Sequence, residues 1–499
     1  MTRPLLLALL VACAPVAPAR EPTPAPWIAD TSQLPPSATA PASAPAAGAL
    51  VAAPGGALAE HYHDVGARIV AAAHVDRGAY GKLEYLTDRI GNRLSGSPQL
   101  DQAIAWARQA MTDDGLDVHT EKVMVPHWVR NTEEGALVSP TARPLRVLGL
   151  GGTIATPKGG ITAPVVVVHD FAGLEAAGDA LKGAIVLFDV PMPAWTEAEG
   201  SHYGDVVKYR SAGASAAAKH GAVAMLMRSV TAKSLRTPHT GAMHYADDAP
   251  KIPAAAVSTE DAALITRLAS HGPVTVHLRL DAQKLADVEP ANTIGELRGS
   301  ELPDEVVVIG GHLDSWDVGQ GAHDDGAGCV TMMQALATIK KLGLHPRRTI
   351  RVVLFTNEEN GVRGGQGYAK DHAAELGKVA FALESDSGGF APRGFTIQAK
   401  DPDGMHRARA RLADIITLVR DLGVTKLVEN FSGTDVEPMV ASGVVAGELV
   451  TDGRSYFDIH HTDADTLDKV DPQQLADDVA AVAVLAYVVA DLPDRVDAP

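Results

Sequence analysis

The chain is short of cysteine, aromatic residues and basic charge, and each shortage excludes a class of protein. Only Cys13 and Cys329 occur among 499 residues, so no disulfide framework can form. Aromatic residues make up 4% of the chain, which disfavours stacking platforms for single-stranded nucleic acid or long sugars. The 43 basic and 61 acidic residues leave a formal net charge of −18, and an acidic surface repels phosphate backbones. We therefore expect no nucleic-acid partner.

Long apolar runs are also scarce. The run at residues 479–490 is shorter than a membrane span and is bounded by aspartates, so it predicts a buried C-terminal helix. What the chain does have is an ordinary globular composition, with 46% hydrophobic and 21% charged residues. Its length is enough for about three domains.

The first 19 residues have the pattern of a signal peptide, with Arg3 before a short apolar run. Two processing sites compete. Residues 10–13 resemble a bacterial lipoprotein box that would make Cys13 a lipid anchor, whereas residues 17–19 resemble an ordinary A-x-A cleavage site. We favour the lipoprotein site because the apolar run is short. Either site predicts an exported protein in the bacterial periplasm, the cell envelope or the extracellular space. A Pro- and Ala-rich disordered spacer is predicted at residues 20–57.

The rest of the chain divides into two parts that differ in their pattern of apolar runs and of Gly and Pro breaks. Residues 58–136 and 284–499 are predicted to form one domain, in which apolar strands and amphipathic helices alternate from residue 292 onward. This alternation predicts an α/β fold with a mixed, mostly parallel sheet covered by helices. Residues 137–283 have short strand-like runs, Gly and Pro breaks and one alanine-rich helical run, and they predict an inserted β-rich domain.

Individual elements are predicted from periodicity. Helical spacing recurs between residues 64 and 115. Strands are expected at residues 116–125, 163–168, 184–190, 306–309, 350–355 and 379–383, and a mixed apolar run at 444–450. Further helices are expected at 211–221, 327–339, 365–376, 406–422 and 472–492.

Imidazoles and carboxylates follow three of the predicted strands. His312 comes after residues 306–309, Glu358 and Glu359 come after 350–355, and Asp386 comes after 379–383. The carboxyl ends of strands are where open α/β sheets place ligand sites. The loops 323–326 and 460–463 add further His and Asp residues. Each fragment alone is more often a turn or a solvated surface, and an ion-pair network without metal is the competing interpretation.

Carboxylates mixed with imidazoles favour Zn²⁺, Co²⁺ or Mn²⁺ over thiolate-selecting metals. There are enough ligands for two ions that share one carboxylate. Such a site polarises a carbonyl and lowers the pKa of a bridging water, so that hydroxide forms near neutral pH. A further carboxylate must move the proton of that water to the leaving amine. In a Glu pair at a strand end, one member can bind metal while the other stays free.

Residues 312–328, with the sequence HLDSWDVGQGAHDDGAG, resemble the signature of metallopeptidase family 28. The WDVGQG stretch within them, and the sequence YFDIHHTDADTLD at 456–468, resemble its carboxypeptidase Q branch. Residues 181–187, 216–224 and 252–258 resemble the protease-associated (PA) domain in order and spacing. The resemblance runs from about residue 76 to the C-terminus, and it implies the zinc exopeptidase fold with an inserted PA domain.

The resemblance implies a ligand set for two Zn²⁺ ions. Asp324 would bridge the ions, His312 and Asp386 would complete one site, and Glu359 and His461 would complete the other.

It also implies roles for residues around the metals. Glu358 would be the general acid/base. Asp314 would orient His312, and Asp325 matches a position associated with an unusual peptide bond that presents Asp324. His460 stands where some relatives carry Tyr, so it would either stabilise an oxyanion or simply pack in its loop. Asp435 would either hold a free substrate amine or cap the helix that follows it, and capping is the commoner role.

We therefore predict an exported dizinc exopeptidase that hydrolyses dipeptides or N-terminal peptide bonds. Cys329 is expected to be a buried packing residue. A non-catalytic metal-binding receptor on the same scaffold is the alternative. A glutaminyl cyclase is disfavoured by the intact ligand set and the insert. A homodimer, a gating role for the PA domain and a choice between aminopeptidase, carboxypeptidase and dipeptidase modes stay open.

Overall fold

The computed structural model describes residues 55–499. The predictions for the signal peptide at 1–19, the lipid anchor at Cys13 and nearly all of the spacer fall outside the described residues. The first helix, α1 (Ala57–Val75), begins at the last residue that was assigned to the spacer.

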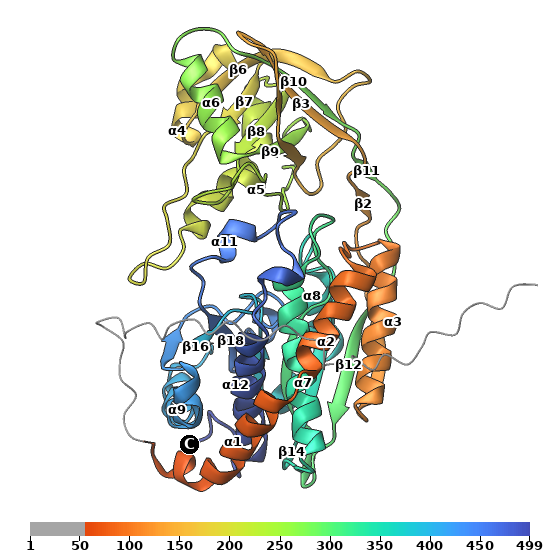
Figure 1. Ribbon diagram of the computed structural model, residues 1–499, viewed down its shortest axis with the longest axis vertical. Coiled ribbons are helices and arrows are strands. Elements are labelled where there is room, and N and C mark those ends of the chain that lie inside the picture. Colours follow the sequence, from red (N-terminus) through yellow and green to blue (C-terminus); the bar gives the residue numbers. More distant parts are fainter. Residues whose placement is uncertain (1–54) are drawn as a thin grey trace, which may run out of the picture. The chain divides into compact units, whose positions relative to one another are not determined.

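The larger part of the chain is built on an eight-stranded mixed sheet (Figure 1). Its strands lie in the order β1 (Asp117–Lys122), β12 (Ala291–Leu297), β14 (Arg348–Phe355), β13 (Leu302–His312), β15 (Val379–Glu384), β18 (Ala446–Thr451), β16 (Pro392–Ile397) and β17 (Lys426–Glu429). The central strands β14, β13, β15 and β18 are parallel to one another. The pairs β1–β12, β12–β14 and β18–β16 are antiparallel, and β17 is parallel to β16. The predicted mixed sheet is confirmed.

Helices cover both faces of this sheet. The side chains of Val306 and Val308 in β13 pack in one cluster with Tyr368 of α8 (Arg363–Asp371) and Met439 of α10 (Glu437–Val440). Helices α7 (Ala327–Lys341) and α12 (Pro472–Asp491) pack against each other and against β13, and α1 packs on α12 (Figure 1). Because both faces are covered, residues 306–309 are all buried, which is why this strand is a continuous apolar run.

The remaining elements complete this part of the chain. They are α2 (Gly78–Tyr85), η2 (Leu86–Ile90), α3 (Pro98–Asp113), η4 (Ala322–Gly326), η5 (Leu376–Lys378), α9 (Pro402–Ile415), η6 (Ile416–Leu422), α11 (Tyr456–Ile459) and η7 (Leu467–Lys469). The helix predicted at 406–422 is therefore α9 followed by the 3₁₀ segment η6. The helix predicted at 365–376 is shorter than expected and ends at Asp371.

A second eight-stranded sheet forms the insert lobe, which we define as the elements from β3 to β10. Its strands lie in the order β4 (Arg143–Leu145), β3 (Glu133–Ser139), β10 (Thr275–Leu280), β6 (Ile161–Val168), β7 (Ile185–Phe188), β8 (Ala224–Arg228), β9 (Ala254–Val257) and β5 (Val147–Gly149). The helices of the lobe are α4 (Phe171–Ala177), η3 (Gly178–Leu181), α5 (Tyr203–Lys219) and α6 (Thr259–Ala269).

The insert lobe has its own core on each side of its sheet. Phe188 and Met225 pack with alanines of α5 on one side, and Leu187 and Leu226 pack with Ile265 of α6 on the other. A two-stranded ribbon of β2 (Trp128–Val129) and β11 (Gln283–Lys284) joins the incoming and outgoing chain. The predicted first residue of the insert, residue 137, lies within strand β3, which begins at Glu133.

Helix α12 is the one described helix that is long and apolar enough to cross a membrane, and 83% of its apolar window is buried inside the protein. It packs against α7 and α1. The prediction of a buried C-terminal helix is confirmed.

Candidate metal centre and active site

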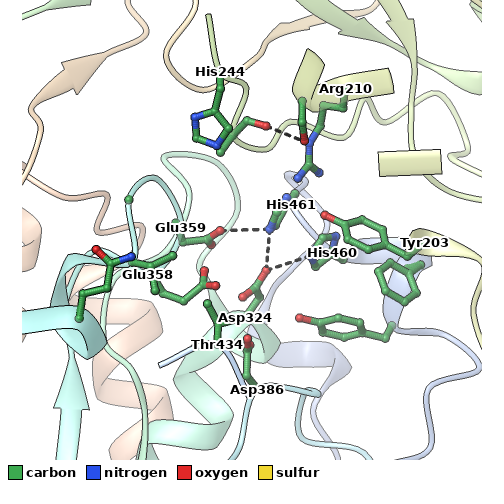
Figure 2. A pocket seen from close by; sticks show the side chains of 17 residues that line it. Tyr203, Arg210, His244, Asp324, Glu358, Glu359, Asp386, Thr434, His460 and His461 are labelled. Carbon is green, nitrogen blue, oxygen red and sulfur yellow. Dashed lines mark hydrogen bonds and ion pairs between the residues drawn. The ribbon is translucent and has the colours of Figure 1, made fainter. Parts of the chain in front are cut away.

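The polar residues lie together at one edge of the main sheet, where the adjacent strands β14, β13 and β15 end. His312 is the last residue of β13, and its backbone pairs with Phe355, the last residue of β14. Glu358 and Glu359 follow β14, and Asp386 follows β15 on the other side of β13. Segment η4 carries Asp324, and the loop after α11 carries His460 and His461. Figure 2 shows Glu358, Glu359, Asp386, His460 and His461 gathered around Asp324.

Asp324 lies between two imidazole rings. Its Oδ1 is 3.2 Å from His312 Nε2, and its Oδ2 is 3.2 Å from His461 Nε2. Each of these nitrogens has a second carboxylate beside it, which is Asp386 at 3.3 Å from His312 and Glu359 at 3.1 Å from His461. The arrangement is two His–carboxylate pairs that share one carboxylate.

The hydrogen bonds of the two rings fix which nitrogen carries a proton. His312 Nδ1 donates to the main-chain carbonyl of Asp314 at 3.0 Å, and His461 Nδ1 donates to the carbonyl of Thr240 at 3.3 Å. A carbonyl can only accept, so in a neutral ring Nε2 is an unprotonated acceptor. Two acceptors that face a carboxylate need a cation between them. The donor set therefore fits metal ions, and second partners on Nδ1 are typical of metal-binding His residues.

Burial supports the same conclusion. Asp324 Oδ2 is buried and accepts no hydrogen bond among the described residues. Burial lowers the pKa of His312, but Asp386 and Asp324 outweigh this effect and raise it well above its usual range. The two imidazoles hold the pKa of Asp324 well below its usual range despite burial. Without metal, protons would have to compensate this concentration of negative charge.

Asp325 also lies near His312 and Asp386, but its oxygens are engaged elsewhere. Oδ2 accepts from the backbone N–H of His312 and Oδ1 accepts from that of Gly328, both at 3.0 Å. Asp325 therefore holds the end of β13 against the start of α7 rather than facing a metal. The peptide bond between Asp324 and Asp325 is cis, which is the unusual bond expected there.

Asp314 contacts His312 through its main chain. Its carboxylate is 3.8 Å from His312 Nδ1, beyond hydrogen-bond distance, and its main-chain carbonyl accepts the ring N–H instead. The Asp314 carboxylate accepts from the backbone N–H of Glu358 at 3.0 Å. It therefore fixes the turn that presents Glu358.

Glu358 lines the cleft beside Glu359 and Asp386 (Figure 2). Burial and the neighbouring carboxylates raise the pKa of Glu358 well above its usual range, and His312 opposes them. A carboxyl group in these surroundings can hold a proton, which a general acid/base must do.

His460 stacks on His461, with ring centroids 3.5 Å apart, and its Nε2 is 3.5 Å from Asp324 Oδ2. Burial and the neighbouring His461 lower its pKa well below the usual range, so the ring is neutral. His460 lines the cleft and also packs on Tyr203, Tyr456 and Phe457. Its location is compatible with both roles predicted for it.

The predicted capping role of Asp435 is wrong for the helix that follows. Helix α10 has no side-chain cap, and Asp435 Oδ1 instead accepts from the backbone N–H of Gly365, in the first turn of α8, at 3.0 Å. The carboxylate is fully buried, and it is Thr434 rather than Asp435 that lines the cleft. Contact with a substrate amine is not supported by this position.

Sequence reasoning missed Asp465, which holds the segment that carries Asp324. Its two oxygens accept from the backbone N–H groups of His323 at 2.8 Å and Asp324 at 3.1 Å. The side chain is buried. The only signal was its place in the motif at 456–468, which did not distinguish it from its neighbours.

The insert lobe also contacts the candidate metal centre. Thr240 exchanges two hydrogen bonds with His461, because its N–H donates to the His461 carbonyl at 3.0 Å and its own carbonyl accepts from the ring. Tyr203, Arg210 and His244 of the lobe line the cleft opposite the strand ends (Figure 2). The cleft has a volume of about 550 Å³. No pattern in the sequence predicted this contact.

Comparisons with known proteins agree with this geometry. The chain is 41% identical to carboxypeptidase Q of Mus musculus over 87% of its own length and 91% of that protein. It is 40% identical to carboxypeptidase Q of Homo sapiens over 83% of its own length and 86% of that protein. The chain belongs to peptidase family M28. The sequence profile of that family matches residues 292–486, and the PA-domain profile matches residues 161–265.

A solved structure places the fold in family M28 as well. A peptidase M28 precursor from Shewanella amazonensis SB2B has 38% identity and a TM-score of 0.83, covering 87% of this chain and 98% of that one. The zinc aminopeptidase BSAP from Bacillus subtilis has 20% identity and a TM-score of 0.59, which shows a shared fold. The predicted zinc exopeptidase fold and the predicted class of metallo-exopeptidase are confirmed by this membership.

Proposed function

We propose that the protein is an exported dizinc exopeptidase that hydrolyses dipeptides or the N-terminal bond of short peptides. The observation that carries the proposal is the position of Asp324, each of whose oxygens faces its own His–carboxylate pair at 3.2 Å. His312 and Asp386 would hold one ion, and Glu359 and His461 would hold the other. Zn²⁺ suits this mixture of imidazole and carboxylate donors, and Co²⁺ or Mn²⁺ would also fit it.

Bound zinc would supply a Lewis acid for the scissile carbonyl and for the attacking water. Glu358 would take the proton from that water and deliver it to the leaving amine. The backbone N–H of Glu358 is held by Asp314, so its carboxylate is presented from a fixed turn beside Asp386. His460, neutral and beside Asp324, would donate a hydrogen bond to the developing oxyanion.

Short substrates follow from the shape of the cleft. Residues of the insert lobe line the far side of the cleft, opposite the strand ends. A volume of about 550 Å³ accommodates a dipeptide. Export is proposed from the N-terminal pattern at residues 1–19.

The test uses the mature protein with zinc, free and N-acetylated dipeptides, and a chelator. We expect chelator-sensitive hydrolysis that zinc restores. Glu358→Gln should retain zinc and lose turnover by at least about 100-fold, as expected for a general acid/base. Glu84→Gln, an exposed glutamate in α2, is the matched control and should keep full activity.

Three outcomes would contradict parts of the proposal. Full activity of Glu358→Gln would remove Glu358 from its role. Zinc content well below two ions per chain in the active protein would contradict the shared-carboxylate centre. Tight zinc binding without hydrolysis of any peptide would support the non-catalytic receptor instead.

A further inference from the structure

Tyr456 lines the cleft, and the mechanism proposed above does not use it. It is the first residue of α11, in the same segment of the main part of the chain that carries His461. The carboxylates of Asp324, Asp386 and Glu358 line the same cleft. Tyr456 is 8% exposed, so its ring is enclosed by the protein at the border of the candidate metal centre.

Aromatic contacts fix the orientation of the Tyr456 ring. Its centroid lies 5.0 Å from that of His460, 5.2 Å from that of Phe457 and 6.5 Å from that of Phe390. His460 and Phe457 belong to its own segment, whereas Phe390 belongs to the loop between β15 and β16. A tyrosine has only two side-chain torsions, so packing against three rings leaves it little freedom. The hydroxyl is therefore held in place without a hydrogen bond of its own.

The hydroxyl of Tyr456 has no hydrogen-bond partner among residues 55–499. Other buried tyrosines of the chain do have one, as expected for this residue type. Tyr62 donates to Asp491 at 3.2 Å, and Tyr368 accepts from Arg351 at 2.8 Å. The Tyr456 oxygen is not sealed among protein atoms either, so the ring is packed while the hydroxyl opens onto the cleft. An unused O–H group in a cleft is the first indication of a ligand.

The charges around Tyr456 keep the proton on its hydroxyl. Burial raises the pKa of Tyr456 well above its usual range, and the nearby carboxylates of Asp324 and Asp386 raise it further. Both carboxylates belong to the proposed metal ligands, so the hydroxyl lies within reach of the electric field of that site. At neutral pH the group is an uncharged donor, which can bind an oxygen that becomes negative.

Tyr456 approaches the site from a different side than the general acid/base does. Figure 2 shows Glu358 on one side of Asp324 and His460 on the other, and Tyr456 packs against His460. In the proposed reaction Glu358 takes a proton from the attacking water, so the water lies on the Glu358 side of the scissile carbonyl. A donor for the carbonyl oxygen must come from another side, and Tyr456 meets this condition.

His460 is the donor that the proposed function already places there, but a protein group competes for its N–H. Its Nε2 is 3.5 Å from Asp324 Oδ2, whereas the hydroxyl of Tyr456 has no competing acceptor. Oxyanion sites commonly combine two donors, so the two residues are compatible.

We propose that the hydroxyl of Tyr456 donates a hydrogen bond to the scissile carbonyl oxygen and stabilises the negative charge that forms on it. This inference rests on the proposed function and adds a catalytic residue to it. As water adds to the carbonyl carbon, the π electrons of the C=O bond move to the oxygen that Tyr456 binds, and the phenol keeps its proton. When the C=O bond forms again, the C–N bond breaks and Glu358 delivers the proton of the water to the leaving amine. A donor that is fixed before substrate binds needs no rearrangement during this step.

The experiment compares Tyr456→Phe with wild type, using zinc-loaded protein and a dipeptide that wild type hydrolyses. The substitution removes one oxygen atom and keeps the ring in its contacts. We expect kcat to fall by about 100-fold, the usual effect of removing one oxyanion donor, while KM and zinc content hardly change. Tyr209→Phe is the matched control, because that ring packs against Phe171 and Phe188 outside the cleft. It should have wild-type kinetics.

Binding of a transition-state analogue gives a second readout that a purely structural role would not change. A dipeptide analogue with a phosphinate in place of the scissile amide carries a negative oxygen where the reaction would form one. Calorimetry should show that Tyr456→Phe binds this analogue about 100-fold more weakly than wild type does. The unmodified dipeptide should bind equally to Glu358→Gln with and without Tyr456→Phe, because its carbonyl oxygen carries no full charge.

Several results would overturn the inference. Wild-type kcat in Tyr456→Phe would overturn it while leaving a metallopeptidase in place. Weaker binding of the unmodified dipeptide, but not of an analogue that lacks the free amine, would assign the hydroxyl to the substrate amine instead. Loss of zinc together with activity would make Tyr456 a structural residue. If wild type hydrolyses no peptide, the proposed function fails, and calorimetry with the phosphinate still decides whether Tyr456 binds a negative oxygen.

Discussion

Arg130 connects the insert lobe to the candidate metal centre, and its removal should destabilise the protein. Nε and Nη2 form a bidentate pair with Asp317, at 2.9 and 2.6 Å. Nη1 donates to the carbonyl of Gly149, and Nη2 also reaches Thr240 Oγ1 at 3.3 Å. Arg130 is 8% exposed. Asp317 follows Trp316, whose backbone N–H donates to Glu359 Oε1 at 3.1 Å.

We expect Arg130→Met to lower the free energy of unfolding by about 3 kcal/mol. Breaking a buried ion pair by removing one partner costs about 3–5 kcal/mol. Two carboxylates would lose their partner, Asp317 and Glu133. The lower end applies because the Asp317 side chain is 23% exposed, so water can solvate it, and because Glu133 still accepts from the backbone N–H of Gly149 at 2.9 Å. Adding Asp317→Asn to the variant should recover part of the loss, because it removes the unpaired charge.

The same variant should weaken zinc binding roughly 10-fold, as loss of a group behind a metal ligand does. Thr240 orients His461, and Trp316 holds Glu359, so the site built from those two ligands should be affected first.

Urea denaturation and zinc content after gel filtration measure both effects. Arg454→Met is the matched control, because Arg454 forms a close pair with Asp452 on the surface, where its side chain is 55% exposed. Surface pairs contribute about 0–1 kcal/mol. If Arg130→Met and Arg454→Met unfold at the same urea concentration with equal zinc content, the reasoning is refuted.

Three further predictions concern other contacts. Asp465→Asn should lower zinc affinity or activity by about 10–100-fold, because the amide nitrogen of Asn cannot accept one of the two hydrogen bonds from the backbone N–H groups of His323 and Asp324. Steady-state kinetics checks this, with Asp463→Asn as the control. Gly151→Ala should destabilise the protein by roughly 1–3 kcal/mol, because its Cβ would collide with the buried Trp316 ring. A Cβ at Gly204 would contact no neighbouring atom, so Gly204→Ala should show no such loss of stability in the same urea assay. Cys329 should resist alkylation until urea unfolds the chain, because the thiol is fully buried and burial raises its pKa. Mass spectrometry measures the labelling, and rapid labelling of the native protein would contradict the prediction.

The sequence predicted the main sheet because strands buried on both faces are continuous apolar runs. Residues 306–309 and 379–383 are such runs, and they became the centre of β13 and β15. It also predicted which residues meet, because parallel strands end at the same edge. His312, Glu359 and Asp386 needed only that rule to be placed together.

Predictions that depended on side-chain direction were weaker. Asp435 precedes a helix, which favours capping, but that helix is only four residues long and the carboxylate turns to α8 instead. Asp314 was expected to orient His312, and it is the main-chain carbonyl of Asp314 that accepts the ring N–H. Spacing in the sequence gives neighbours along the chain, and it does not tell which atom of a residue makes the contact.

The sequence by itself determined the types of the candidate site residues, their order along the strands and the family to which the chain belongs, since these depend on local pattern and motif. Only the tertiary structure decided how the insert lobe enters the site. Thr240 and His461 are 221 residues apart, and Arg210 lies in a helix with no unusual periodicity. Contacts of this kind depend on how two separately packed sheets dock, and docking leaves no periodic signal in either segment.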